Sequence, residues 1–85
     1  MESFDAFKEK LDREHNWPTT YLFKFMVPSA KAEELKEIFV KESIQTKDSK
    51  SGKYVSFTIK KLINSSDEVI EIYIKAGEIE GLIAL

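Results

Sequence analysis

Few residues of this chain could carry out catalysis, and each candidate also has a simpler structural explanation. His15 is the only histidine, and the chain has no cysteine that could join it in a metal site. It stands at the predicted end of a short helix, where a histidine serves as a helix-end cation or a solvated side chain. We therefore expect a structural or surface role for His15, and we expect the protein to use no metal and no cofactor.

Two glutamates and three serines are the other candidates for acid–base or nucleophilic chemistry. Glu68 and Glu71 fall on one face of a predicted helix and could form an acid pair, but Glu71 and Lys75 have the spacing of a surface ion pair. The serines all stand at predicted helix starts, where capping explains a hydroxyl: Ser29, Ser65 and Ser66. The glycines form no phosphate-binding motif. We therefore predict no catalytic residue and no enzymatic activity.

One segment matches part of a nucleic-acid-binding motif. Residues 54–57, Tyr-Val-Ser-Phe, correspond to the end of the RNP1 pattern of RNA-recognition motifs, which also needs an exposed aromatic residue where this chain has Gly52. One ring contributes about 1 to 3 kcal/mol of base stacking, too little without a basic surface. The lysines that could form such a surface are Lys24, Lys50, Lys53, Lys60 and Lys61. We prefer to read them as lysines that protect the strands, and RNA binding is our third hypothesis.

Length and composition predict one small domain. A chain of 85 residues can bury about 60 to 65% of the surface that it exposes when unfolded, enough for one core. We assign residues 1–85 to a single domain, with an N-terminal helix at residues 1–16 and a core at residues 17–85. The net charge of −2 gives no overall attraction for nucleic acid or anionic lipid. Without a signal-peptide pattern or a long apolar run, we expect a cytoplasmic protein that does not enter a membrane.

Two strands with regular alternation should form the centre of a sheet. From Lys53 to Leu62, one face carries Val55, Phe57 and Ile59, the pattern of a half-buried strand. The opposite face carries Tyr54, Ser56, Thr58 and Lys60. From Thr20 to Val27, the aromatic face carries Tyr21, Phe23, Phe25 and Val27 and should be core. Its opposite face carries Leu22, Lys24 and Met26.

The remaining segments predict three helices and two short strands. The helices are expected at Ser3–Glu14 with Ser3 as N-cap, at Ala30–Glu42 after a Ser29 cap, and from about Ser65 to Ala76. Ser65 with Glu68 fits a capping box, and Gly77 suits a left-handed C-terminal cap. The short strands are expected at Ile44–Lys50, as a sheet edge, and at Leu82–Leu85.

This order predicts an α+β fold, the ferredoxin-like β-α-β-β-α-β sandwich, with a four-stranded antiparallel sheet and two helices on one face. We expect the Tyr21 and Tyr54 strands to lie side by side and parallel in its centre. The other face of the sheet is the candidate interaction surface, unless the N-terminal helix covers it. It would consist of Leu22, Lys24, Met26, Tyr54, Ser56, Thr58 and Lys60.

Two stretches carry a resemblance to a known family. They are residues 18–25, Pro-Thr-Thr-Tyr-Leu-Phe-Lys-Phe, and residues 49–58, Ser-Lys-Ser-Gly-Lys-Tyr-Val-Ser-Phe-Thr, followed by the helix-to-strand close through Tyr73. Over residues 17–85 the chain resembles the YbeD-like family of small bacterial domains of unknown function. The resemblance implies a ferredoxin-like fold similar to ACT-type regulatory domains, and it brings no catalytic residues.

These observations lead to three functional hypotheses. The first is a non-enzymatic module that binds a protein partner or a second copy of itself, and that regulates the partner. The second is an ACT-like domain that senses a small molecule. ACT domains commonly have a glycine between the first strand and the first helix, where this chain has residues 27–30, Val-Pro-Ser-Ala. The third is RNA binding through the open sheet.

Overall fold

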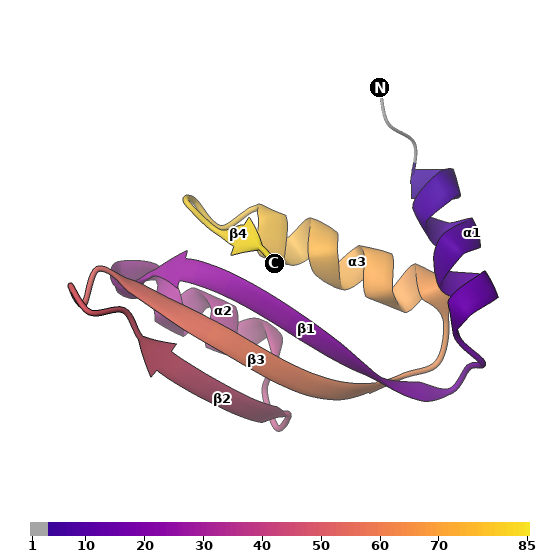
Figure 1. The fold of residues 1–85 in the computed structure, drawn as a ribbon, viewed down its shortest axis with the longest axis horizontal. Coiled ribbons are helices and arrows are strands. Elements are labelled where there is room, and N and C mark those ends of the chain that lie inside the picture. Colours follow the sequence, from indigo (N-terminus) through magenta and orange to yellow (C-terminus); the bar gives the residue numbers. More distant parts are fainter. Residues whose placement is uncertain (1–3) are drawn as a thin grey trace.

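In the computed structural model, which describes residues 4–85, helices and strands follow one another in the expected order. The elements are α1 (Phe4–Glu14), β1 (Thr19–Pro28), the short 3₁₀ helix η1 (Ser29–Lys31), α2 (Ala32–Ile38), β2 (Ser43–Asp48), β3 (Tyr54–Ile63), α3 (Ser66–Gly77) and β4 (Ile83–Ala84). Figure 1 shows the two long central strands with β2 outside β3. The predicted Ser3 cap of α1 lies outside the described residues.

The four strands form an antiparallel sheet in the order β2-β3-β1-β4. The prediction that the central strands β1 and β3 are parallel is wrong, because they pair antiparallel over their whole length. The crossover through α2 makes β1 and β2 run in the same direction. The β2–β3 hairpin then reverses the chain, so a strand placed between β1 and β2 must oppose both. The ferredoxin-like α+β fold itself is confirmed.

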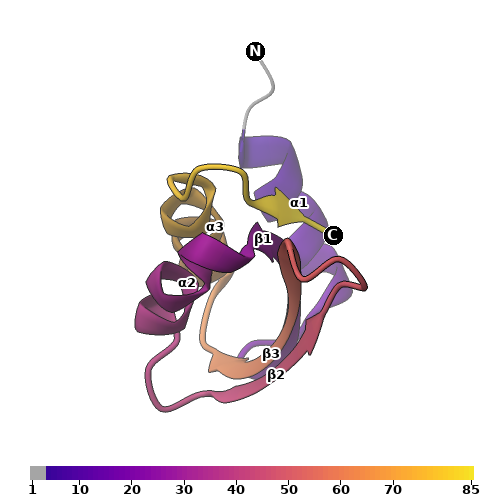
Figure 2. The ribbon, with the colours of Figure 1, turned by 90° about the vertical axis from the view of Figure 1, so that its left-hand side faces the viewer.

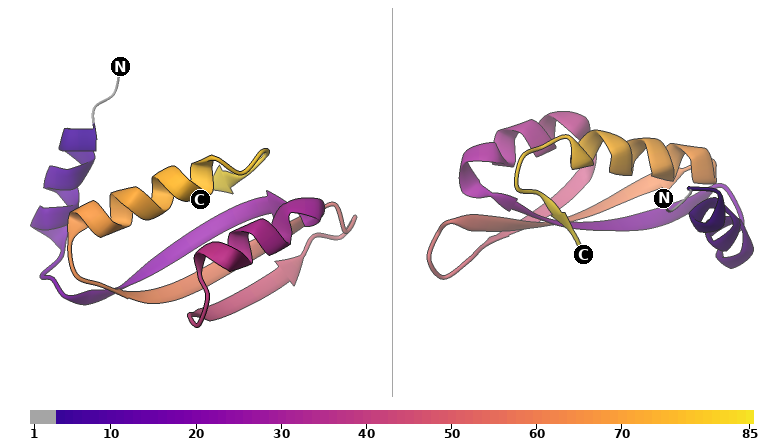
Figure 3. Two further views of the ribbon diagram at one scale, coloured as in Figure 1. Left: turned by 180° about the vertical axis from the view of Figure 1, so that it is seen from behind. Right: turned by 90° about the horizontal axis from the view of Figure 1, so that it is seen from above.

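Helices α2 and α3 cover one face of the sheet, as the view from above shows (Figure 3). Six of the seven predicted inward positions are buried, namely Phe23, Phe25 and Val27 from β1 and Val55, Phe57 and Ile59 from β3, whereas Tyr21 is half-buried. Phe25 lies directly opposite Phe57 in the β1–β3 register, and both side chains belong to the hydrophobic core. Seen along the strands, the sheet curves around the two helices (Figure 2).

The β1–α2 junction differs from the predicted Ser29 cap. Ser29 lies in η1, and its hydroxyl donates a hydrogen bond to the Gly52 carbonyl at 2.6 Å instead of capping α2. Its backbone N–H also bonds to the Lys53 carbonyl at 2.9 Å, which extends the pairing of β1 with β3 by one residue. Because the chain is still held by this ladder, α2 begins later than predicted. It also ends earlier than predicted, at Ile38 rather than Glu42.

The structure confirms the predicted N-cap of α3 and contradicts its predicted C-terminal cap. Ser65 is the N-cap, and its hydroxyl accepts a hydrogen bond from the Glu68 N–H at 3.3 Å. Gly77 is not the left-handed cap, because it lies inside the helix and only Gly52 and Gly81 have positive φ among the described glycines. At the end of the helix, the N–H groups of Glu78 and Ile79 each donate a hydrogen bond to the carbonyl three residues earlier, and the Ile79 side chain is buried. The left-handed residue comes later, at Gly81.

Candidate interaction surface

Helix α1 packs against α3 at one end of the molecule (Figure 3). Lys8 donates a hydrogen bond to the Ser66 hydroxyl at 2.8 Å and forms an ion pair with Asp67 at 3.3 Å. The ring centroids of Phe7 and Tyr73 lie 5.9 Å apart in an edge-to-face arrangement. The face of the sheet opposite α2 and α3, which we call the open face, is therefore not covered by α1.

All seven predicted surface residues belong to the open face. The β1–β3 register pairs Leu22 with Lys60, Lys24 with Thr58 and Met26 with Ser56, while Tyr54 lies opposite Pro28. Leu22 and Tyr54 expose 46% and 41% of their surface, although large apolar side chains are usually buried. Lys24 and Lys60 are also exposed, whereas Met26, Ser56 and Thr58 are half-buried. The pairing thus brings the candidates together as one continuous surface.

Two apolar residues extend this surface beyond the prediction. Leu62 of β3, opposite Thr20 of β1, is 60% exposed, and Ile83 of β4, opposite Met26, is 52% exposed. The alternation of the central strand already pointed to Leu62, because it follows Ser56, Thr58 and Lys60 at even spacing. Ile83 had no comparable signal, since its face depends on how the two-residue strand β4 pairs with β1.

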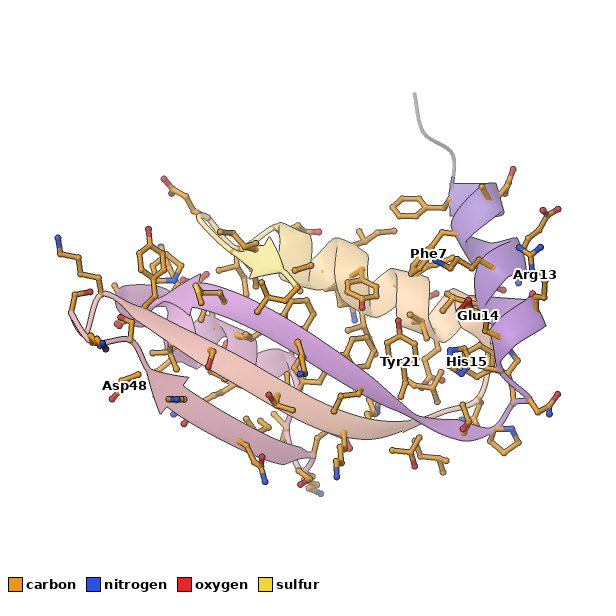
Figure 4. The ribbon with its side chains drawn as sticks, in the orientation of Figure 1. Phe7, Arg13, Glu14, His15, Tyr21 and Asp48 are labelled. Carbon is orange, nitrogen blue, oxygen red and sulfur yellow. The ribbon has the colours of Figure 1, made fainter. Side chains whose placement is uncertain are left out.

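A shallow groove lies on the open face beside the β2–β3 hairpin, with a cavity volume of about 290 Å³. Its residues come from β1, β2, β3 and the turn: Met26, Lys47, Asp48, Ser49, Lys50, Tyr54 and Ser56. Asp48 pairs with Val55, so alternation assigns its side chain to the helical side although the residue borders the groove. Figure 4 places Asp48 at the hairpin end of the sheet, far from α1. The groove has room for an apolar side chain from a partner.

Within the described strands, the open face carries lysines and no carboxylate. In the register of the sheet, Lys47 of β2 lies opposite Ser56 and therefore joins Lys24 and Lys60 on this face. Among the residues of β1 to β4, the only acidic one is Asp48. Lys61 belongs to the helical side, where it pairs with Glu42 at 2.6 Å. The open face is thus positively charged, although the whole chain carries a net charge of −2.

His15 and the two glutamates considered for catalysis lie in different parts of the molecule. The His15 ring lies 5.2 Å from that of Trp17 and 5.6 Å from that of Tyr21, at the α1 end of the molecule (Figure 4). Glu68 and Glu71 line a second groove, which also contains Lys61 and Lys75. Within residues 4–85, no cluster of three or more His, Cys, Asp or Glu side chains is placed to hold a metal ion. None of the described helices is long and apolar enough to cross a membrane.

A pair of tyrosines joins β1 to α3 next to α1. The hydroxyl oxygens of Tyr21 and Tyr73 lie 3.3 Å apart and share a hydrogen bond, and Tyr73 packs against Phe7, Phe23 and Phe25. Burial raises the pKa of the Tyr73 hydroxyl above its ordinary value of 10.0, and the hydrogen bond to Tyr21 raises it further. The folded protein therefore holds this proton at pH values where the unfolded chain releases it.

This pKa shift predicts a loss of stability in alkaline solution. Below pH 10.0 the contribution of Tyr73 is fully present, and above it the free energy of unfolding should fall as the pH rises. Tyr73→Phe removes the titrating hydroxyl, so urea unfolding between about pH 9 and pH 11 should show a weaker pH dependence than in the wild type. Tyr54→Phe, at an exposed tyrosine, is the matched control and should keep the wild-type dependence. Equal pH dependence in all three proteins would contradict the assignment.

A comparison with models of protein families shows to which family this chain belongs. A family model described as a protein of unknown function, DUF493, matches residues 12–84. The chain belongs to the DUF493 family. The match contains all four strands, and hence the whole open face of this DUF493 protein, but only the last residues of α1. The family description indicates a small uncharacterised domain and names no activity. No curated protein and no solved structure matches the chain.

Proposed function

We propose that this DUF493 protein is a non-enzymatic interaction and regulatory module that docks a protein partner on the open face of its sheet. The observation that carries the proposal is the exposure of apolar residues on the one face that no helix covers among residues 4–85. Leu22, Tyr54, Leu62 and Ile83 together offer apolar surface that costs free energy in water and that a partner would bury. The cytoplasm remains the expected location.

The resemblance to YbeD-like domains agrees with this proposal and adds no site. The ACT-like alternative has less support, because the β1–α2 junction has no glycine and the Ser29 hydroxyl there is bonded to Gly52 at 2.6 Å. RNA binding also has less support, because residues 4–85 contribute Tyr54 as the single aromatic ring exposed on the open face. A docked protein would bury the exposed apolar residues of this face, whereas neither small-molecule sensing nor RNA binding requires those residues.

The proposal predicts that partner capture depends on the open face. A Leu22→Ala, Met26→Ala, Tyr54→Ala variant should retain partner protein from lysate at least about tenfold less than the wild type, since three apolar contacts are lost. The measurement is an affinity pull-down with mass spectrometry, after circular dichroism has shown that the variant is folded.

The matched control removes exposed apolar surface from the helical side of the molecule. Val40 and Ile74 are 64% and 46% exposed and lie outside the sheet, so a Val40→Ala, Ile74→Ala variant should retain partners as the wild type does. Loss of the same proteins in this control and not in the open-face variant would place the docking surface on the helices and refute the proposal. If wild type and open-face variant retain identical proteins, the open face is not the site.

A further inference from the structure

We infer that the open face recognises an acidic, partly apolar segment of a protein partner. This inference rests on the proposed function and deepens it, because it specifies the chemistry that the partner must present. It follows from the separation of charge in the molecule and from the arrangement of apolar residues around the lysines. A second copy of the chain and nucleic acid both fit this surface less well.

The charges of the chain are distributed unevenly between its two sides. Of the 15 acidic residues in the sequence, the strands contain only Asp48, and that residue pairs with Val55 of the helical side. Lys24, Lys47 and Lys60 lie on the open face without a carboxylate of the described strands beside them. A partner with carboxylates would therefore meet complementary charge on this side and like charge on the helical side.

The apolar residues of the open face lie toward its two ends, with Lys24 between them and with Lys60 and Lys47 beside them. Leu22 and Leu62 are diagonal neighbours toward one end, because Leu22 is opposite Lys60 and Leu62 is opposite Thr20. Met26, Tyr54 and Ile83 lie toward the other end, where the groove of about 290 Å³ opens. A fitting segment thus has apolar side chains on both sides of a central acidic stretch, and one of them enters the groove.

A second copy of the chain is a poor occupant for this surface. In a symmetric dimer joined through the open faces, the same patch meets itself. Lys24, Lys47 and Lys60 of one copy would then approach the same three lysines of the other, with no open-face carboxylate from the described strands to pair with them. Like charges that face each other across an interface oppose association, so self-association is less favourable than binding to an acidic partner.

Nucleic acid supplies negative charge but does not match the remaining chemistry. Arg13 is the only arginine of the chain, and it lies on α1, at the far end from the hairpin (Figure 4). Tyr54 is the one exposed ring of the open face in the described structure, whereas single-stranded nucleic acid is usually held by several stacked rings. Leu22, Leu62 and Ile83 would also stay exposed against a phosphate backbone, but an apolar protein segment would bury them.

The test compares three probes by NMR titration of the whole protein. The probes are a short peptide in which glutamates are flanked by leucine and phenylalanine, the same peptide with glutamine in place of each glutamate, and oligouridine. The acidic peptide should shift the amide signals of Lys24, Thr58 and Lys60, and its affinity should fall as salt is added. The glutamine peptide should bind about tenfold more weakly, which corresponds to the loss of two or three exposed ion pairs.

Matched charge variants assign the effect to the open face. Lys24→Gln, Lys47→Gln, Lys60→Gln should weaken binding of the acidic peptide about tenfold. Lys31→Gln, Lys36→Gln, Lys75→Gln makes the same change in net charge on the helical side and should leave binding unchanged. An equal loss in both variants would mean that the peptide responds only to net charge, which contradicts the inference.

The outcomes separate this inference from the proposed function. If both peptides bind the open face equally well, the charge inference is wrong while docking of a protein on this face stands. If neither peptide binds, the inference is also wrong, and the pull-down decides the proposed function independently. If oligouridine shifts the same signals at lower concentration than the acidic peptide, the face binds nucleic acid and both are wrong.

Discussion

Phe57→Ala is expected to lower the free energy of unfolding by about 3 to 5 kcal/mol, because it leaves a cavity in the middle of a small core. Phe57 is only 1% exposed, lies on the central strand β3 and is directly opposite Phe25. Small domains are stable by only about 5 to 15 kcal/mol, so the change removes a large part of the total. The measurement is urea unfolding followed by circular dichroism.

The matched control for Phe57 is Tyr54→Ala on the same strand. Tyr54 lies on the open face and is 41% exposed, so its truncation removes fewer buried contacts and should cost about 1 kcal/mol or less. A cost at Tyr54 equal to that at Phe57 would mean that the two faces of β3 are assigned the wrong way round. The surface proposed for partner binding would then be part of the core.

Gly81→Ala should destabilise the protein by about 2 to 4 kcal/mol, from backbone strain together with a steric clash. Gly81 has φ +81°, in the left-handed region that side chains other than glycine rarely adopt. An added Cβ would also lie 2.7 Å from the Cγ atom of Pro28, at the end of β1. The substitution therefore forces the turn before β4 away from β1, and urea unfolding measures the cost.

Two other glycines separate the contributions to this effect. Gly52 has φ +74° but open space around its Cα, so Gly52→Ala should show the backbone strain alone, about 1 kcal/mol. Gly77 lies inside α3 with an ordinary φ and open space, so Gly77→Ala should be neutral or stabilising by up to about 1 kcal/mol. Equal costs at Gly52 and Gly81 would show that contact with Pro28 has no effect.

The central strands could be predicted from the sequence because their alternation is strong. Phe23 and Phe25 of β1, like Phe57 and Ile59 of β3, are buried as the period of two requires. The direction of pairing could not be obtained from these patterns, since alternation is the same in parallel and antiparallel strands. The crossover through α2 and the β2–β3 hairpin determine it, and the predicted parallel pair was wrong because it did not follow from that order of elements.

Other features depend on contacts between segments that are far apart in the sequence. Ser29 is of a residue type that often caps helices, but its hydroxyl donates a hydrogen bond to the carbonyl of Gly52, which is 23 positions away in the sequence. The place of α1 follows from the hydrogen bond of Lys8 and the ring contact of Phe7 with α3, which no local pattern shows. Alternation alone places Lys24 and Lys60 on the open face, but Lys47 joins this face only through its pairing with Ser56.

The most direct test of the central claim, that the open face is the docking surface, is site-specific photo-crosslinking in cells that make the protein. A photoreactive phenylalanine analogue is placed singly at Leu22 or Leu62 on the open face, and at Val40 or Ile74 on the helical side. All four positions are exposed and apolar, so each tolerates the analogue. We expect a discrete crosslinked protein from Leu22 and Leu62 only. Crosslinks that form at Val40 and Ile74 but not at Leu22 and Leu62 would contradict the claim.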